Sequence, residues 1–165
     1  MNLTELAAQL GDALQRLGAQ VSTAESCTGG GIAEAITSIA GSSAWFEAGY
    51  ITYSNAQKTR QLGVPAELFK QVGAVSAEVV QAMARGAQRN SGARFAVAVS
   101  GIAGPGGGTA EKPVGTVWIA WADDSHVQAQ RYLFTGNREA VREQTVAAAL
   151  QGLLALVVGE KRFRG

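Results

Sequence analysis

The hydrophobic positions of the chain recur with a helical period near both of its ends. Near the start they lie three or four residues apart and stop before Gly18, which suits the end of a helix: Leu3, Leu6, Ala7, Leu10, Leu14 and Leu17. Near the other end the same spacing runs through Val146, Leu150, Leu153, Leu154 and Val157. The pattern predicts a helix over residues 3–17 and a long last helix capped by Asn137.

Between these helices the pattern changes to short runs of strand-forming residues. Residues 95–99 form a continuous apolar run, which is typical of a central strand buried on both faces. Residues 114–122 and 127–134 predict two strands joined by a short polar turn, and therefore a hairpin. Further strands are predicted over residues 20–24 and 49–54, and further helices over 30–40, 54–62 and 76–90.

This order of elements predicts an α/β fold of three layers, α/β/α, with a mixed sheet to which the hairpin adds the antiparallel part. The 165 residues suit a single domain over residues 1–165. A chain of that length buries roughly 70% of its unfolded surface, which is enough for a core without disulfides or metal. No repeat, low-complexity segment or linker marks a domain boundary.

Composition and charge narrow the classes of partner. Hydrophobic residues make up 47% of the chain, charged residues 16%, and the formal net charge is +1. These values are typical of a soluble globular protein and argue against broad nucleic-acid binding, which needs a basic face. The longest apolar run, residues 153–158, is too short to span a bilayer, and the N-terminus lacks the pattern of a signal peptide. We expect neither a nucleic acid nor a membrane as partner.

Cysteine and histidine each occur once, as Cys27 and His126. A single cysteine forms no intramolecular disulfide, which fits a reducing, cytoplasmic compartment. One histidine and one cysteine cannot supply the four ligands of a structural zinc site, and no acidic cluster indicates magnesium. We therefore expect no bound metal. His126 falls in the predicted hairpin turn, which disfavours a Ser-His-Asp triad.

Ser26 stands where a predicted strand turns into a glycine-led helix, in the run Thr-Ala-Glu-Ser-Cys-Thr-Gly-Gly-Gly over residues 23–31. A hydroxyl at such a junction either caps the helix or faces a ligand at the edge of the sheet. The glycines permit close backbone approach, and the N–H groups of Cys27, Thr28, Gly29 and Gly30 are candidates for an oxyanion hole.

Cys27 is a second candidate nucleophile, because a thiol at a helix N-terminus can have a lowered pKa. Its other interpretation is a small buried hydrophobic residue. Neighbouring side chains at a strand end point to opposite sides, so Ser26 and Cys27 should not both face the cleft. The residues alone leave open which of the two attacks.

A serine without a histidine needs another base, and Lys58 behind Tyr53 is the best candidate in the chain. Tyr53 is predicted to end a strand, and Lys58 to lie one turn into the next helix. Burial or a nearby cation would lower the pKa of the lysine into a useful range, and the tyrosine hydroxyl could relay the proton. An isolated lysine, however, is normally a solvated surface residue.

The segment after the apolar run at 95–99 is a further candidate site. Residues 101–113 hold five glycines, among them Gly101 and Gly104, and two prolines, and they follow directly after Ser100. Such a loop at a strand end can bind a phosphate through backbone N–H groups, although it matches neither a Walker loop nor a dinucleotide fingerprint. Arg142, near the start of the last helix, could clamp a phosphate or form a solvated ion pair.

Taken together, these segments resemble the C-terminal domain of the competence/damage-inducible protein CinA. The resemblance covers nearly the whole chain, in order, and is carried by six motifs at residues 23–30, 41–46, 53–55, 73–76, 100–105 and 112–117. Several long motifs in the correct succession are far more specific than any one of them.

The resemblance implies an activity, a substrate and a set of residues. Stand-alone members of the family hydrolyse nicotinamide mononucleotide to nicotinate mononucleotide and ammonia. The implied nucleophile falls on Ser26, and the implied tyrosine and lysine fall on Tyr53 and Lys58. Substrate contacts would fall on the loop, with Ser100, Gly101 and Gly104, and on the helix arginine, Arg142.

We therefore expect an amidase that acts on a small nucleotide without a cofactor, and that assembles as a homo-oligomer, a dimer. Two alternatives stay open from the sequence. Cys27 could be the nucleophile of the same amidase, or the chain could be a non-catalytic nucleotide-binding or interaction module linked to competence or DNA damage. An activated serine beside Tyr53 and Lys58 would have no purpose in a pure binder.

Overall fold

A five-stranded mixed sheet forms the middle layer of the computed structural model, which describes the backbone of residues 1–164 and the side chains of residues 1–159. The strand order is β2-β1-β3-β4-β5, with parallel pairing among the first three strands and antiparallel pairing among the last three. The strands are β1 (Val21–Glu25), β2 (Phe46–Ile51), β3 (Phe95–Gly101), β4 (Thr116–Ala122) and β5 (Val127–Leu133).

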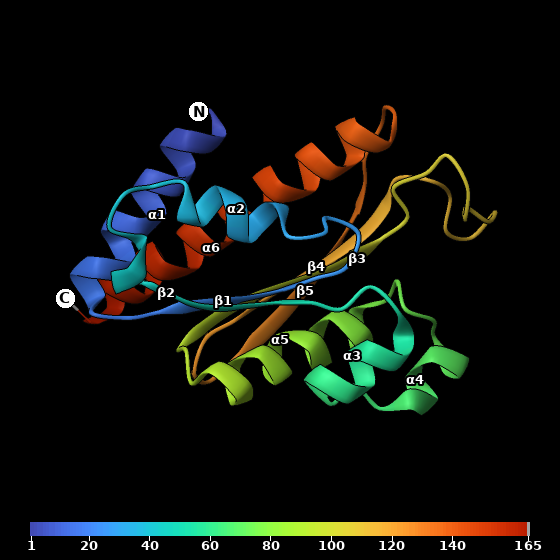
Figure 1. Cartoon of the computed structure of the whole chain (residues 1–165), viewed down its shortest axis with the longest axis horizontal. Helices are drawn as coiled ribbons and strands as arrows, with labels where there is room; N and C mark the ends of the chain where they lie inside the picture. Colours follow the sequence, from blue (N-terminus) through green and yellow to red (C-terminus); the bar gives the residue numbers. More distant parts are fainter. Residues whose placement is uncertain (165) are drawn as a thin grey trace.

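Helices cover both faces of this sheet, which confirms the predicted three-layer α/β fold (Figure 1). One face carries α1 (Leu3–Leu17), α2 (Gly31–Thr37) and α6 (Arg138–Arg164), and the other carries α3 (Asn55–Leu62), α4 (Ala66–Gln71) and α5 (Ala77–Ser91). A short 3₁₀ helix, η1 (Ser42–Ala44), leads into β2. The predicted hairpin is confirmed as β4 and β5.

Most element boundaries follow local signals that the sequence carries. Asn2 caps α1 by accepting a hydrogen bond from the N–H of Glu5 at 2.8 Å, and Asn137 caps α6 through the N–H of Ala140 at 2.9 Å. Ser54 caps α3 by accepting from the N–H of Gln57 at 3.2 Å. The second strand runs over Phe46–Ile51 and not over the predicted 49–54, so it both begins and ends three residues earlier; Ser54 serves as the helix cap instead.

The other boundary error concerns the helix predicted over residues 30–40. In the structure α2 ends at Thr37, whose hydroxyl donates back to the carbonyl of Ala33 at 2.8 Å. A Ser-Thr-type side chain that binds the preceding turn competes with the helical ladder and favours an early end. The chain then turns at Gly41 into η1 instead of continuing the helix.

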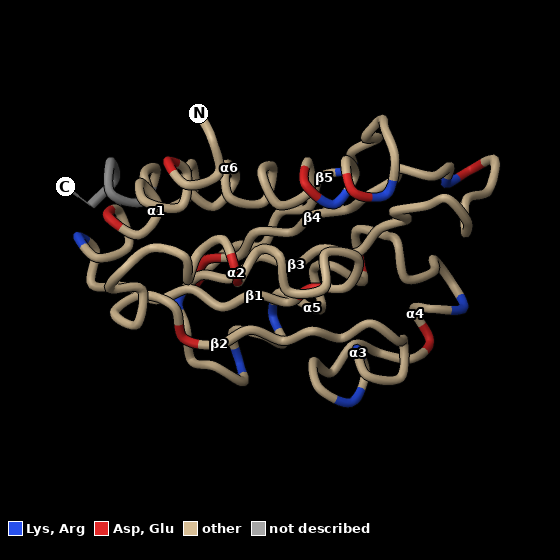
Figure 2. Tube along the Cα trace, turned by 45° about the horizontal axis from the view of Figure 1, so that its top comes forward, with Lys and Arg blue, Asp and Glu red and all other residues tan. Residues whose placement is uncertain are grey.

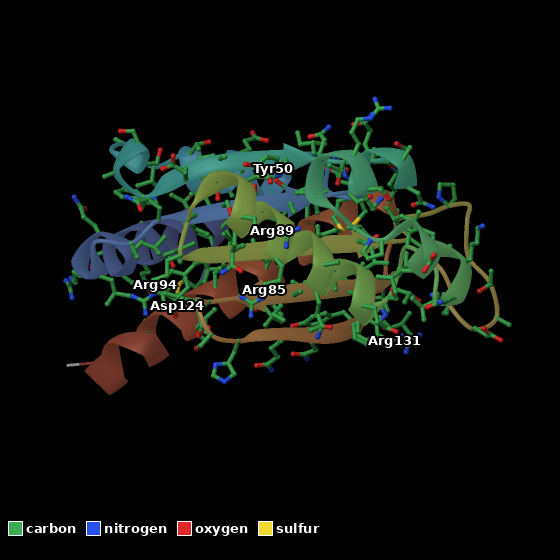
Figure 3. All side chains as sticks on the ribbon, turned by 90° about the horizontal axis from the view of Figure 1, so that it is seen from below. Tyr50, Arg85, Arg89, Arg94, Asp124 and Arg131 are labelled. Atoms are coloured by element: carbon green, nitrogen blue, oxygen red, sulfur yellow. The ribbon has the colours of Figure 1, made fainter. Side chains whose placement is uncertain are left out.

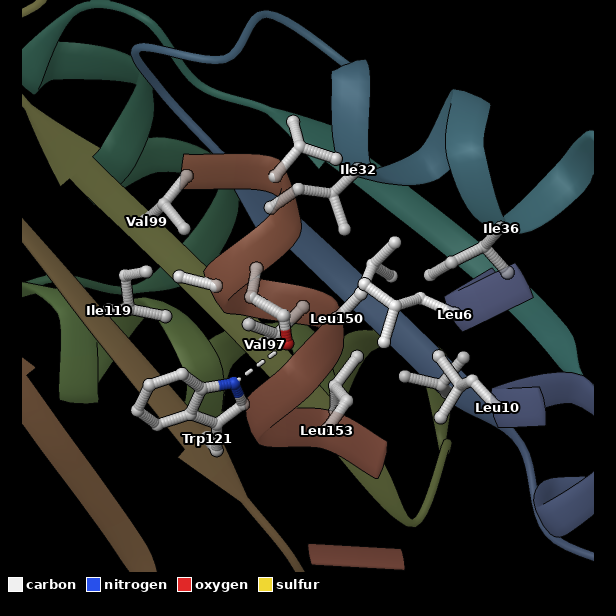
Figure 4. Packing of buried hydrophobic residues seen from close by; sticks show 14 of the residues in the cluster. Leu6, Leu10, Ile32, Ile36, Val97, Val99, Ile119, Trp121, Leu150 and Leu153 are labelled. Carbon is white, nitrogen blue, oxygen red and sulfur yellow. Dashed lines mark hydrogen bonds between the residues drawn. The ribbon is translucent and has the colours of Figure 1, made fainter. Parts of the chain in front are cut away.

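Two hydrophobic cores fill the spaces between the layers. Figure 4 shows the larger one, where α1, α2 and α6 bury leucine and isoleucine side chains against the sheet. The indole N–H of Trp121 donates to the carbonyl of Ala149 in α6 at 2.9 Å, so that this ring is both packed and hydrogen-bonded. The second core lies beneath α3 and α5 and includes Leu62, Val79 and Met83.

The position of α3 is fixed by a close contact with α5. A side chain at Gly86 would place its Cβ 2.1 Å from the carbonyl oxygen of Leu62, so only a glycine allows the two helices to approach this closely. Arg89, one turn further along α5 and labelled in Figure 3, donates to the same carbonyl at 3.2 Å. Helix α3 is therefore held firmly against the layer below the sheet.

Over Arg138–Gly159, α6 is long and apolar enough to cross a membrane by length and composition alone. A single such helix is weak evidence of a span, because the core helix of a globular protein meets the same criteria. Here Val141, Leu150, Leu153 and Val157 are buried against the sheet and α1. In Figure 2 acidic and basic positions are interspersed along the described chain, including the start of α6.

Candidate active site

Ser26 lies at the point where the connections leaving β1 and β2 diverge. The chain leaves β1 through α2 on one face and reaches β2, and it leaves β2 through α3, α4 and α5 on the other face and reaches β3 on the opposite side of β1. In open α/β sheets the carboxyl ends of strands at such a switch point form the ligand site. Ser26 follows directly after β1 at this position, and its N–H donates to the carbonyl of Val99 at 3.2 Å.

Lys58 reaches this serine from the layer below. Its Nζ donates a hydrogen bond to Ser26 Oγ at 3.1 Å and another to the backbone carbonyl of Tyr53 at 3.0 Å. Lys58 is only 2% exposed and Ser26 only 7%, so the pair is almost completely removed from water. The solvated position that an isolated lysine normally takes is thus not the one observed.

The buried environment suits Lys58 to act as a base. Desolvation lowers its pKa from the ordinary value of 10.5, while interaction with Cys27 raises it by a smaller amount. Among the described residues no carboxylate forms an ion pair with Lys58. At 3.1 Å a neutral Lys58 and Ser26 can exchange donor and acceptor roles, and the lone pair of the amine then accepts the hydroxyl proton.

Cys27 points away from this pair and into the core beneath α1, α2 and α6. Burial raises the pKa of its thiol from 9.0 to about 11, against smaller lowering effects from its own backbone N–H, Lys58 and Arg142. A thiol with so high a pKa carries almost no thiolate near neutral pH and is a poor nucleophile. The geometry favours Ser26 over Cys27.

The turn after Ser26 is stabilised by Glu25, which the sequence reasoning did not single out. The carboxylate of Glu25 is fully buried and accepts from the hydroxyl of Thr28 at 2.5 Å and from the N–H groups of Ile32 and Ala33 at 2.8 and 3.0 Å. It thereby caps α2 from seven residues upstream, favoured by the helix dipole. No known capping motif has this spacing. The only sequence signal for this role is the position of Glu25 at the end of a predicted strand that leads into a helix.

The backbone of this turn leaves N–H groups available for an oxyanion. The N–H of Gly29 donates to the carbonyl of Ser26 at 3.0 Å. Among the groups that the structure describes, none accepts a hydrogen bond from the N–H of Thr28 or Gly30. Gly29 and Gly30 have φ values of 58° and 107°, a conformation that glycine adopts most readily. These free donors are the candidates for an oxyanion hole.

Tyr53 is placed differently from what its expected relay role requires. Its side chain is 60% exposed, and its hydroxyl accepts a hydrogen bond from Arg138 at 3.0 Å, with no contact to Lys58 or Ser26 among the described hydrogen bonds. The group of Tyr53 that touches Lys58 is its backbone carbonyl. Because Arg138 holds the hydroxyl, 85 positions away in the sequence, the side chain turns away from the lysine.

Arg138 also links this tyrosine to the glycine loop, since it donates to the carbonyl of Gly104 at 2.8 Å. Ser100 is buried near the end of β3, next to Ser26 in the parallel register, and Gly101 ends that strand. The structure therefore brings Ser100, Gly101 and Gly104 to the sheet edge that carries Ser26. The contacts of Arg138 join residues far apart in the sequence, so no local pattern predicts them.

Arg142 contacts the same turn from the α6 side. Its guanidinium donates to the carbonyl of Thr28 at 3.1 Å and lies beside Gly29. Arg142 also borders a cavity of about 320 Å³ between α1, α2 and α6, together with Glu34, Glu139 and Glu143. An arginine in this place can bind the backbone, an anion or both.

The remaining candidates for chemistry lie elsewhere. His126 is exposed in the β4–β5 turn, at the edge of the sheet opposite to Ser26. No group of three or more histidine, cysteine, aspartate or glutamate side chains that could hold a metal ion occurs among the described residues. The chemistry that the described geometry supports is nucleophilic attack by a serine with a lysine as base.

Comparison with known proteins identifies the family of the chain. The sequence profile of the family described as the CinA C-terminal domain matches residues 3–157. A protein of Pseudomonas putida named nicotinamide-nucleotide amidohydrolase PncC is 73% identical over 154 residues, which cover 93% of this chain and 96% of the relative. A protein of the same name from Escherichia coli K12 is 55% identical over 152 residues, which cover 92% of each chain.

Solved structures show the same fold. The crystal structure of a CinA-superfamily protein from Klebsiella pneumoniae superposes with a TM-score of 0.93 at 40% identity, covering 96% of this chain and 99% of the other. That of the competence/damage-inducible protein CihA from Agrobacterium tumefaciens superposes with a TM-score of 0.91 at 49% identity, covering 93% and 94% of the two chains.

Proposed function

This chain belongs to the CinA C-terminal domain family, and we propose that it hydrolyses the carboxamide of nicotinamide mononucleotide, with Ser26 as nucleophile and Lys58 as general base. The products are nicotinate mononucleotide and ammonia. The activity and the nucleotide substrate agree with the names of its close relatives. The single observation that carries the residue assignment is the buried hydrogen bond of 3.1 Å between Lys58 Nζ and Ser26 Oγ.

In the first half of the reaction, Ser26 Oγ forms a bond to the carboxamide carbon while its proton moves to Lys58 Nζ. The oxygen of the carboxamide becomes an oxyanion, which the N–H groups of Thr28 and Gly30 stabilise. Lys58 then gives its proton to the carboxamide nitrogen, the C–N bond breaks and ammonia leaves. An acyl group remains on Ser26, and Lys58 is neutral again.

In the second half, a water molecule attacks the acyl carbon and gives one proton to Lys58. The tetrahedral intermediate collapses, Lys58 returns that proton to Ser26 Oγ, and nicotinate mononucleotide is released as the acid. The acid then ionises to the carboxylate and gives the second proton of the water molecule to solvent. One lysine thus acts as base and acid in turn, which is the role that histidine has in serine hydrolases. The carbonyl of Tyr53 holds the amine in place throughout.

For substrate binding we propose that Ser100, Gly101 and Gly104 line the nucleotide site and that Arg142 binds its phosphate. Arg138→Ala is the matched comparison for Arg142→Ala. Arg138 lies four residues away on the same helix, but it contacts Gly104 of the loop and not the turn after Ser26. If Arg142 binds the phosphate, Arg142→Ala raises KM for the mononucleotide by about tenfold or more and has little effect with nicotinamide riboside, which lacks the phosphate. An Arg142→Ala variant whose KM for the mononucleotide equals that of the wild type would contradict the assignment.

The test of the proposed function is release of ammonia from nicotinamide mononucleotide by the purified protein. Ser26→Ala and Lys58→Met should each lower kcat by about 10²-fold or more, while folding like the wild type. Lys70→Met, which changes an exposed lysine on α4, is the matched control and should keep full activity. Wild-type protein without turnover would overturn the function, and a fully active Lys58→Met would remove the lysine from the mechanism.

We propose in addition that the protein acts in the cytoplasm as a homo-oligomer, a dimer. The single cysteine, Cys27, is free, as expected for a reducing compartment. Ile51 and Tyr53, at and just beyond the end of the edge strand β2, are large side chains with more than half of their surface exposed, as in subunit contacts. Light scattering coupled to gel filtration tests this directly, since a monomeric mass at micromolar concentration would contradict the dimer.

A further inference from the structure

The three parallel strands end in neighbouring hydroxyl side chains, of which the mechanism uses only one. Thr52 follows β2, Ser26 follows β1, and Ser100 lies next to the last residue of β3. The N–H of Thr52 donates to the carbonyl of Glu25 at 3.0 Å, and that of Ser26 donates to the carbonyl of Val99 at 3.2 Å. These bonds continue the register of the sheet, so Thr52 is the direct neighbour of the nucleophile on the β2 side.

Thr52 and Ser26 also point to the same layer. Two residues earlier in each strand, Ala24 belongs to the core beneath α3 and α5, and Tyr50 packs against that core. Figure 3 looks onto this layer and labels Tyr50. Since side chains alternate along a strand, Thr52 and Ser26 continue the same face. Lys58 approaches from that layer.

The hydroxyl of Thr52 has no hydrogen-bond partner although the residue is completely buried. A buried polar group without a partner destabilises the folded protein, and such groups in native structures call for an explanation. Valine would fill the same space without the penalty. The hydroxyls of Ser22 and Thr23, within β1, are also buried without a partner, so Thr52 differs from them by its place beside the nucleophile. This place indicates a role in a state other than the resting one.

Lys58 lacks an acceptor in the state that the mechanism requires. As a neutral amine it has two N–H donors and one lone pair, and as an ammonium it has three N–H donors. The structure provides two acceptors, Ser26 Oγ and the carbonyl of Tyr53. When the amine takes the serine proton, its third N–H has no described acceptor, and a buried ammonium with an unsatisfied donor is strongly disfavoured.

We propose that Thr52 is a positioning residue whose hydroxyl oxygen accepts the third N–H of Lys58 while the amine carries the proton of Ser26. The contact forms in the charged state by rotation of either side chain, and it is absent in the resting enzyme. Thr52 thus acts through Lys58 and does not touch the substrate. This inference rests on the proposed function, because it needs Lys58 to become charged during turnover.

The experiment compares Thr52→Val, Thr52→Ser and Thr23→Val in steady-state hydrolysis of nicotinamide mononucleotide, with melting temperatures measured in parallel. Thr23 is the matched control: it is fully buried with an unpartnered hydroxyl, but it lies within β1 and faces the other layer. We expect Thr52→Val to lower kcat by about 10–100-fold with KM unchanged and a melting temperature equal to or above that of the wild type. Thr52→Ser and Thr23→Val should keep kcat within about threefold.

Each outcome decides the matter. Thr52→Val with wild-type kcat overturns the inference, and so does a rise in KM alone, which would make Thr52 a substrate contact. Loss of kcat in Thr52→Ser as large as in Thr52→Val overturns it as well, since the hydroxyl would then not be the cause. Wild-type protein that releases no ammonia overturns the proposed function itself, whereas an active wild type beside a fully active Thr52→Val overturns only the role of Thr52.

Discussion

Replacement of Cys27 by alanine tests directly whether Ser26 and Cys27 face opposite sides of the sheet at the end of β1. Ser26 faces Lys58, and Cys27 faces the core beneath α2 and α6, where burial raises its thiol pKa from 9.0 to about 11. At pH 8 a pKa of 11 leaves about 0.1% of the thiol ionised, roughly a hundredfold less than a pKa of 9. We expect Cys27→Ala to retain most of the amidase activity, because the thiolate is nearly absent.

The raised pKa of Cys27 also predicts that the unfolding free energy depends on pH. A group whose pKa is raised in the folded state holds its proton longer when folded than when unfolded, so its contribution is complete below pH 9 and is lost as the pH rises toward 11. Two pKa units correspond to about 2.7 kcal/mol. Relative to Cys27→Ala, the wild type should therefore lose about 2–3 kcal/mol of unfolding free energy between pH 8.5 and pH 11.

The assay is urea denaturation of both proteins at half-unit pH steps, combined with kcat for ammonia release at pH 7.5. Contributions from groups that both proteins share cancel in the difference between the two curves. Parallel curves would refute the reasoning about burial. A natively folded Cys27→Ala without activity, beside an active Ser26→Ala, would refute the assignment of the nucleophile and favour the thiol.

Three further substitutions test the supports of the site. Because burial lowers the pKa of Lys58, the unfolding free energy of the wild type should rise as the pH increases from the pKa of the folded protein toward 10.5. Lys58→Met should lack this rise. The same pH dependence of the unfolding free energy in both proteins, measured by urea denaturation, would contradict this. Gly86→Ala should lower the unfolding free energy by about 1–3 kcal/mol and lower kcat, because its Cβ would push the Leu62 end of α3 away from α5. Gly106→Ala, where an added Cβ meets nothing within 4 Å, should be neutral. Glu25→Gln should cost about 1–3 kcal/mol, because α2 loses charged acceptors for its N–H groups, and an unchanged melting temperature would contradict that role.

The layers of the fold could be predicted from local signals, whereas Lys58 is singled out as the partner of Ser26, 32 residues away, because the only histidine falls in the hairpin turn and because of the family resemblance. A run of apolar residues marked the central strand, and caps such as Ser54 and Asn137 marked helix starts. Lys58 lies four residues after the Ser54 cap, so the helix direction alone brings it back toward the end of β1. The strand run and the helix caps depend on residues close in sequence, which is why the sequence pattern predicts them.

The orientation of the Tyr53 side chain could not be predicted in the same way. Its hydroxyl is held by Arg138 from the start of α6, and the glycine loop is held by the same guanidinium through Gly104. These contacts join three segments that meet only after the sheet has formed. A relay through the tyrosine is chemically reasonable from spacing alone, and only the tertiary contact shows that its carbonyl, not its hydroxyl, meets Lys58.

The alternation of side chains at the end of β1 determines which groups can react. Glu25 and Cys27 fall on the α2 side, where one caps the helix through its carboxylate and the other fills the core. Ser26, between them, falls on the side of Lys58. A shift of the β1 register by one residue would exchange these environments and place a thiol beside the amine. If Ser26 is the nucleophile, as proposed, then packing selects it: α2 buries the residues on one face of the strand end, and α3 brings Lys58 to the other face.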